Sequence, residues 1–133
     1  MIVEDSPLDR DAIKFILRGM GYQNVAEAGD GQSAIEFLTD PVRNTPPVEF
    51  IISDLKMMKM SGMEFLKEVR ANDSLRHLPF ILVTTEDAMN EVLNAIVAGV
   101  SDYIVKPVTE AILKKKMLAA YLKMSNIVGA GQP

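Results

Sequence analysis

The feature that most restricts the fold of this chain is a regular alternation of short apolar runs with longer amphipathic segments. Strand-sized runs lie at 1–3, 25–28, 50–53, 80–83 and 103–105. Two of them are almost wholly apolar, as are strands that are buried on both faces of a parallel sheet. The order strand then helix, repeated five times, predicts an α/β domain with a parallel sheet, right-handed crossovers and helices on both faces.

The segments between these runs carry helical patterns. Ser6 can cap a helix that starts at Pro7, with Asp9 three residues after the cap. Further helices are predicted at about 32–38, from Gly62, at 88–98 with Gly99 as the stop, and after a cap at Thr109. The apolar positions predicted to form the buried faces are Leu8, Ala12, Ile16 and Met20 in the first helix, and Leu113, Met117, Tyr121 and Met124 in the last.

The length of 133 residues suits a single domain, which we place at 1–124, followed by a tail at 125–133. The first strand has only Met1–Val3 ahead of its acids, whereas strands typically run about five or six residues. Either this strand is short or the chain has been trimmed at its start.

Composition excludes several classes of function. The chain has no cysteine, so disulfides, thiolate catalysis and cysteine-ligated metal sites are ruled out, and a cytoplasmic location is compatible with this composition. The formal net charge of −4 argues against direct binding of nucleic acid or of an anionic membrane. No apolar run approaches the length that crosses a bilayer.

Polar residues follow directly on the apolar runs, where packing gives no reason for them. Glu4 and Asp5 follow the first run, Asp54 the third, Thr84 the fourth and Lys106 the fifth. In an open parallel sheet, ligands bind outside the carboxyl ends of the strands. We therefore expect these side chains to converge on one edge of the sheet.

The chemistry of these groups favours phosphoryl transfer. Clustered carboxylates repel one another, and Mg²⁺, which prefers oxygen ligands, removes that repulsion. An aspartate is a competent nucleophile, while the ammonium of Lys106 and the hydroxyl of Thr84 can bind phosphoryl oxygens. Phosphoryl transfer depends chiefly on such positioning and electrostatics.

The sequence resembles a known family in several blocks, in order and over nearly the whole chain. Val3–Ser6, Ile52–Leu55, Met60–Gly62, Val83–Thr84 and Tyr103–Pro107 are similar to the signature blocks of response regulator receiver domains, the chemotaxis type in particular. The resemblance implies a flavodoxin-like fold, a doubly wound five-stranded parallel sheet with strand order 2-1-3-4-5. It also implies a two-component signalling role.

The resemblance implies roles for the acidic residues. Asp54 would be the phosphoacceptor. Mg²⁺ would be bound by Asp5 directly, by Glu4 through water, by Asp54 and by the backbone carbonyl of Lys56.

The resemblance also implies roles for the remaining site residues. Thr84 and Lys106 would bind the phosphoryl group, and Tyr103 would be an aromatic switch that moves inward when Thr84 shifts. The Lys106–Pro107 peptide bond would be cis, an isomer that proline permits.

The implied partners are a sensor histidine kinase or a phosphotransfer protein as donor, and a downstream protein target. The target would bind a face built by the fourth helix, fifth strand and fifth helix, with Val92, Ala95, Asp102 and Val105 at its edges. The protein would be a monomer or a phosphorylation-dependent dimer, and would catalyse only its own phosphorylation and dephosphorylation.

Two other functions match part of this residue pattern. An aspartate-nucleophile phosphatase usually carries a second acid two residues after the nucleophile, for acid–base work, and Lys56 stands there. A pseudo-receiver that only binds partners usually lacks the acidic pair, the acceptor or the lysine, and all are present here.

Some positions depart from the family pattern or allow an ordinary structural explanation. Lys56 and Met58 stand in the loop after Asp54, where Met58 replaces a usual proline. We expect Lys56 to pair with Glu86 across the site and to slow attack by water on the acyl phosphate.

Other residues allow an ordinary structural explanation. Tyr103 can be a packing residue of its strand, and Lys114–Lys116 can be the solvated face of a helix. His77 can be a loop residue. Met57, Met58 and Met60 can fill the core or form a contact surface.

Overall fold

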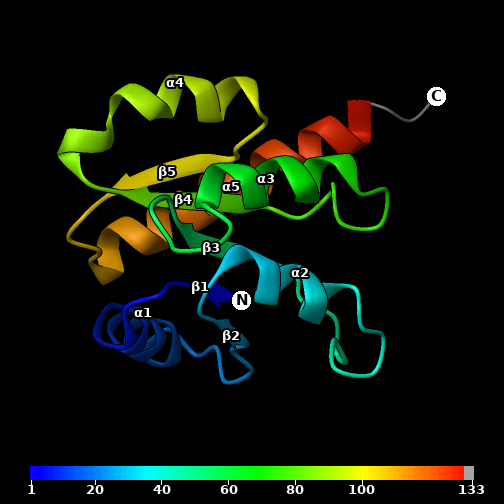
Figure 1. Cartoon of the computed structure of the whole chain (residues 1–133), viewed down its shortest axis with the longest axis horizontal. Helices are drawn as coiled ribbons and strands as arrows, with labels where there is room; N and C mark the ends of the chain where they lie inside the picture. Colours follow the sequence, from blue (N-terminus) through cyan, green and yellow to red (C-terminus); the bar gives the residue numbers. More distant parts are fainter. Residues whose placement is uncertain (131–133) are drawn as a thin grey trace.

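The computed structural model describes the backbone of residues 1–130 and the side chains of residues 1–126, and it confirms the predicted fold. Five parallel strands form one sheet in the order β2-β1-β3-β4-β5, with β1 lying between β2 and β3 (Figure 1). The strands are β1 (Ile2–Val3), β2 (Glu27–Ala28), β3 (Ile51–Asp54), β4 (Phe80–Thr84) and β5 (Asp102–Val105). The first two are short, and β2 keeps only half of the run predicted at 25–28.

Helices cover both faces of the sheet, as buried strands require. They are α1 (Pro7–Gly19), α2 (Gly31–Leu38), α3 (Gly62–Ala71), α4 (Asn90–Val97) and α5 (Glu110–Ala130), with a 3₁₀ turn at Glu86–Ala88 before α4. On one face α1 and α5 pack on a cluster that includes Ile2, Ile52 and Ile81. On the other face α2, α3 and α4 pack on a cluster that includes Val3 and Phe80.

Caps appear where the sequence predicts them. The hydroxyl of Ser6 accepts a hydrogen bond from the Asp9 N–H at 3.3 Å, and that of Thr109 accepts one from Ile112 at the same distance. Gly99 ends α4 with φ of 96°, a left-handed conformation that glycine adopts without steric cost.

The predicted buried faces of α1 and α5 are partly wrong. Leu8 is 80% exposed, and α1 instead buries Ile13 and Leu17, with Ile16 and Met20 packed beside them. A helix turns about 100° per residue, so positions four residues apart drift about 40° per step, and the predicted row drifts off the sheet. The observed stripe uses spacings of three and four, which stay on one side. In α5, Leu113 and Met124 are buried, whereas Tyr121 is half exposed.

The domain boundary after residue 124 stays a prediction. Helix α5 continues past it to Ala130, and residues 131–133 of the predicted tail lie outside the described residues. Within the described part of the chain, no helix has both the length and the apolar character that spanning a membrane requires.

Arg70, in the last turn of α3, joins several segments at the amino ends of β4 and β5. Its guanidinium donates to the carbonyl oxygens of Gly99 at 2.8 Å and of Leu78 at 2.7 Å. It also donates to Arg76 O, Ser101 Oγ and Met124 Sδ. Burial lowers the pKa of Arg70 to about 10. Ser101 Oγ also accepts the Phe80 N–H at 3.0 Å, so this cluster links α3 to the amino ends of β4 and β5.

Candidate functional site

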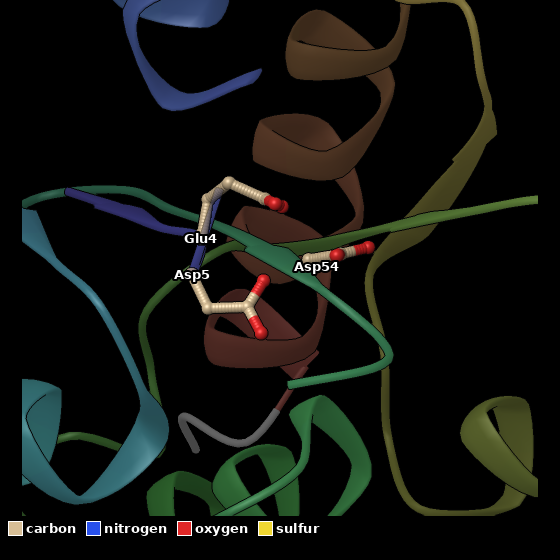
Figure 2. A group of neighbouring side chains, drawn as sticks. All are labelled: Glu4, Asp5 and Asp54. Atoms are coloured by element: carbon tan, nitrogen blue, oxygen red, sulfur yellow. The ribbon is translucent and has the colours of Figure 1, made fainter. Parts of the chain in front are cut away.

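Three predicted acids meet at the carboxyl edge of the sheet. Val3 of β1 pairs with Ser53 of β3, so the next residues along, Glu4 and Asp54, emerge side by side. Glu4, Asp5 and Asp54 each offer a carboxylate oxygen within 4.8 Å of the others, and Figure 2 shows the three side chains together at the ends of β1 and β3. The expected convergence of these acids is confirmed.

Glu4 is the most constrained of the three. Its residue is only 2% exposed, and its Oε1 accepts the Ser6 N–H at 3.1 Å. Among the described side chains, its Oε2 is the one buried oxygen or nitrogen that lacks a hydrogen-bond partner. Burial, reinforced by the neighbouring Asp54, raises the pKa of Glu4 to about 8. A buried carboxyl oxygen without a hydrogen-bond partner is costly, and it marks Glu4 as a group that the fold alone does not satisfy.

Asp54 is held at the end of β3 with its carboxylate partly accessible. Its side chain is 11% exposed, and its Oδ1 accepts the N–H of Leu55 at 3.0 Å. A Cβ added at Gly62 would overlap the carbonyl oxygen of Asp54, while the Gly62 N–H donates to Leu55 O at 2.8 Å. Gly62 is therefore required because α3 begins directly against the backbone of Asp54.

Lys106 brings one ammonium to the acids. Its Nζ lies 3.6 Å from Asp54 Oδ2 and 3.9 Å from Glu4 Oε2. The nearest carboxylate oxygen is Asp9 Oδ2, which accepts a hydrogen bond from Nζ at 3.3 Å. Burial lowers the pKa of Lys106, but Asp54, Glu4 and Asp9 together raise it more, so the net shift is upward. Sequence reasoning placed Asp9 only in the first turn of α1, three residues after the cap, and missed its contact with Lys106.

Thr84 and the peptide bond after Lys106 occupy the predicted places at the ends of β4 and β5. Thr84 is 2% exposed, and its hydroxyl donates to the Thr85 carbonyl oxygen at 3.3 Å. The Lys106 N–H donates to Thr84 O at 2.8 Å, which fastens the two strand ends together. The Lys106–Pro107 peptide bond is cis, as predicted.

Tyr103 lies on β5, half-buried against the core cluster. The ammonium of Lys116 stands 5.0 Å from the centre of its ring and pairs with Asp102 at 3.0 Å. Lys116 therefore contacts β5, which the interpretation of Lys114–Lys116 as a solvated face did not foresee.

The loop after β3 corrects one prediction. Lys56 Nζ lies 3.7 Å from Asp87 Oδ2, and both side chains are exposed. The hydroxyl of Thr85 bonds to Asp87, and both contacts lower the pKa of Asp87. The predicted partner, Glu86, was wrong by one residue, because the 3₁₀ turn at 86–88 presents the next acid to the loop.

The methionines of that loop differ in burial, and so in whether they fill the core or could form a contact surface. Met57 and Met60 pack against the core, whereas Met58 is 77% exposed. Core filling therefore holds for the first two only.

The predicted edges of a target-binding face also need correction. Val92 and Ala95 are buried, at 7% and 1% exposed, whereas Leu93 and Val97 are exposed. Helix α4 carries apolar residues on both sides, so its pattern alone could not tell the buried side from the exposed one. Asp102 and Val105 of β5 are partly exposed.

The donor set fits a hard divalent cation. The acids offer carboxylate oxygens, the ligand type that Mg²⁺ prefers, and their oxygens lie close enough to share one ion. The buried Oε2 of Glu4, which has no hydrogen-bond partner among the described residues, supports such an ion, since a dication would offset the charge of the acids.

Comparisons with known proteins agree with this geometry. A family model described as the response regulator receiver domain matches residues 1–118. The chain is 38% identical over 117 residues to the chemotaxis protein CheY of Pseudomonas aeruginosa, covering 88% of this chain and 90% of that protein.

Solved structures agree as well. A response regulator receiver domain protein from Clostridium thermocellum superposes with a TM-score of 0.81 at 25% identity, covering 95% of each chain. The receiver domain of the sensor histidine kinase PA1611 from Pseudomonas aeruginosa superposes with a TM-score of 0.75 at 27% identity, covering 90% of this chain and 93% of that one. That structure has a magnesium ion coordinated in its active site cleft.

Proposed function

The chain belongs to the family of response regulator receiver domains, and from this membership we propose that Asp54 is its phosphoacceptor. The standard role of the family is to accept a phosphoryl group in two-component signalling. The observation that carries the proposal is the position of the Asp54 carboxylate, which is partly accessible and lies 3.6 Å from Lys106 within a cluster of acids that suits a dication.

The proposed reaction is a displacement at phosphorus. A carboxylate oxygen of Asp54 forms the new O–P bond, and the P–N bond to a histidine of the donor breaks as the imidazole nitrogen leaves with the electron pair. Lys106 supplies a positive charge to the phosphoryl oxygens, where charge develops in the transition state. The Leu55 N–H holds Asp54 Oδ1, which fixes the orientation of the nucleophile.

The residues that would hold Mg²⁺ are Asp5, Asp54, the backbone carbonyl of Lys56 and, through water, Glu4. When bound, the ion would offset the negative charge of the acids and of the phosphoryl oxygens. The buried Glu4 fits an indirect role, because Oε1 already accepts the Ser6 N–H. Its Oε2 lies 3.9 Å from Lys106 Nζ and has no hydrogen-bond partner within the described residues.

Thr84 and Tyr103 are proposed to carry the signal away from Asp54. To bind a phosphoryl oxygen, the hydroxyl of Thr84 must leave the carbonyl oxygen of Thr85, which it contacts at 3.3 Å. Its departure would open space beside β5 for Tyr103, which is half-buried. The two residues would then shift a two-state equilibrium of the face formed by α4, β5 and α5.

The partners follow from this role. The donor would be a sensor histidine kinase or a phosphotransfer protein, and a downstream protein would bind the face of α4, β5 and α5, where Leu93 and Val97 are exposed. We propose a cytoplasmic domain at 1–124 that is monomeric or dimerises on phosphorylation. It would act on no external substrate, because Lys56 occupies the place of the acid that phosphatases use.

The test is labelling with a small phosphodonor. Acetyl phosphate with Mg²⁺ should add one phosphoryl group that mass spectrometry maps to Asp54, and chelation of the metal should prevent it. The Asp54→Asn variant should show no labelling, while Asp73→Asn, an exposed aspartate, should label like the wild type. Stoichiometric labelling of Asp54→Asn would refute the assignment, and steady turnover of a generic phosphate ester would support the phosphatase instead.

A further inference from the structure

The carboxylate nearest to the ammonium of Lys106 belongs to α1 and lies outside the predicted site. Asp9 Oδ2 is 3.3 Å from Nζ, whereas Asp54 Oδ2 is 3.6 Å away. Only the Asp9 contact is a hydrogen bond. In this state the lysine is therefore bound more closely to a helix residue than to the proposed phosphoacceptor.

The first turn of α1 is fastened to the site in a way that fixes this contact. Ser6 caps the helix by accepting the Asp9 N–H, and the Ser6 N–H donates to Glu4 Oε1 at 3.1 Å. Arg10 Nη1 donates to the carbonyl oxygen of Glu4 at 2.8 Å. Helical side chains lean toward the N-terminus of their helix, which directs Asp9 toward the edge of the sheet where Lys106 emerges.

We propose that Asp9 is a positioning residue that holds the ammonium of Lys106 in the unphosphorylated protein and competes with the phosphoryl group for it. This inference rests on the proposed function. The Asp9 side chain is 48% exposed and that of Lys106 26% exposed, so the pair is partly solvated and weak enough to exchange. A phosphoryl group brings close to two negative charges and would draw the ammonium from Asp9.

Asp9 also has an ordinary structural role that must be separated from this one. It is an acid in the first turn of α1, where a negative charge stabilises the helix. A residue with that role alone would lower the stability of the protein when neutralised, but it would not strengthen binding at Asp54. The sign of the change in binding therefore distinguishes the two roles.

The experiment measures the affinity of the full chain for beryllofluoride, a mimic of the phosphoryl group, at saturating Mg²⁺ by NMR titration. Asp9→Asn should bind the mimic about two- to fivefold more tightly than the wild type, the range that a partly exposed ion pair represents. Asp11→Asn removes the same charge from the same helix at an exposed position and should change the affinity by less than this. Asp9→Glu keeps the charge and should return the affinity toward the wild-type value.

The outcomes separate the two proposals. If the wild type does not bind beryllofluoride with Mg²⁺, the proposed function fails. If the wild type binds but Asp9→Asn binds equally or more weakly, or if Asp11→Asn tightens binding by the same factor, only the role of Asp9 is overturned. A melting temperature measured for each variant reports the helix-stabilising role independently.

Discussion

Two clusters around partly or fully buried ionisable groups lie at opposite ends of the strands of the same sheet, and they are built differently. At the amino edge, the guanidinium of Arg70 has five N–H groups. It donates to five acceptors, all of them uncharged: the carbonyl oxygens of Arg76, Leu78 and Gly99, Ser101 Oγ and Met124 Sδ. At the carboxyl ends of the strands, the carboxylates of Glu4, Asp9 and Asp54 share the ammonium of Lys106. Glu4 Oε2 has no hydrogen-bond partner within the described residues.

The difference distinguishes a charged group that stabilises the fold, Arg70, from a group of acids that is suited to binding a ligand. A charged group whose donors are all satisfied is part of the structure, and its removal leaves its acceptors without their partner. A buried ionisable group without a full set of hydrogen bonds or counter-charges destabilises the protein unless a ligand supplies them. Replacement of Arg70 should therefore destabilise the protein, whereas replacement of Glu4 should stabilise the metal-free protein.

The largest expected effect is at the amino edge. Arg70→Met keeps an apolar stem but leaves three carbonyl oxygens without their donor, and we expect it to lower the free energy of unfolding by about 2–4 kcal/mol. Urea denaturation measures this. Arg76→Met, at an exposed side chain, is the control and should stay within about 0.5 kcal/mol of the wild type. An unchanged midpoint for Arg70→Met would mean that the cluster does not stabilise the fold.

The next effect has the opposite sign. Glu4→Gln replaces a carboxyl group that is 2% exposed and whose Oε2 has no hydrogen-bond partner within the described residues. Because burial makes this group costly to ionise, the substitution should raise the free energy of unfolding of the metal-free protein at neutral pH by roughly 1–3 kcal/mol. The same variant should bind Mg²⁺ more weakly, as titration calorimetry would measure. Glu68→Gln, on the exposed side of α3, should change neither quantity. A destabilised Glu4→Gln protein would show that the acid is as well satisfied as Arg70.

The effect of Glu4 on the free energy of unfolding should also depend on pH. The pKa of Glu4 is raised from 4.5 to about 8, so the folded state binds a proton that the unfolded state has released. The contribution of Glu4 to stability is full below its ordinary pKa and is lost as the pH rises through about 8. In chelator-treated protein, the stability gap between Glu4→Gln and the wild type should therefore widen from pH 5 to pH 8. A constant gap in urea unfolding experiments would contradict the shift.

The two edges also differ in how far the sequence predicts them. Glu4, Asp54 and Lys106 were predictable because each follows an apolar run, and the ends of parallel strands meet at one edge. Arg70 was not, since a basic residue in the last turn of an amphipathic helix is typical of a solvated position. Four of its five acceptors lie in turns at 76–78 and 99–101, and the fifth is Met124 Sδ of α5. Only tertiary packing brings these segments together.

The same limit explains the smaller misses. Asp9 reaches Lys106 across 97 positions of sequence, and no local pattern encodes that contact. Helix α4 is apolar on both sides, so the exposure of Leu93 and the burial of Val92 depend on how the helix is rotated against the sheet. Periodicity specifies which residues share a face, and packing decides which face is covered.

A smaller effect is expected where the Arg70 cluster meets β4. Ser101→Ala removes the acceptor of both the Phe80 N–H and one N–H of Arg70. We expect a loss of about 1 kcal/mol in the free energy of unfolding, because the buried Phe80 N–H and the partly buried Arg70 N–H lose their acceptor, while Arg70 keeps its other contacts. Ser74→Ala, at an exposed position, is the matched control. Equal midpoints for the two variants in urea would show that the cluster does not depend on this hydroxyl.

The smallest effect on stability concerns a third kind of charge, the exposed pair of Lys56 and Asp87 at the mouth of the site. Solvent screens such a pair, so Lys56→Ala should leave the urea midpoint unchanged. Its proposed effect is kinetic, because the pair links the loop after Asp54 to the turn after Thr84 and would hinder water that approaches an acyl phosphate. Lys56→Ala should shorten the lifetime of the phosphorylated protein, measured by loss of the mass label after removal of acetyl phosphate. Lys67→Ala, an exposed lysine on α3, should not. If Lys56→Ala and the wild type lose the label at the same rate, the pair has no role in the lifetime of the phosphorylated protein. The differences in stability and binding would then be confined to the clusters around Arg70 and Glu4.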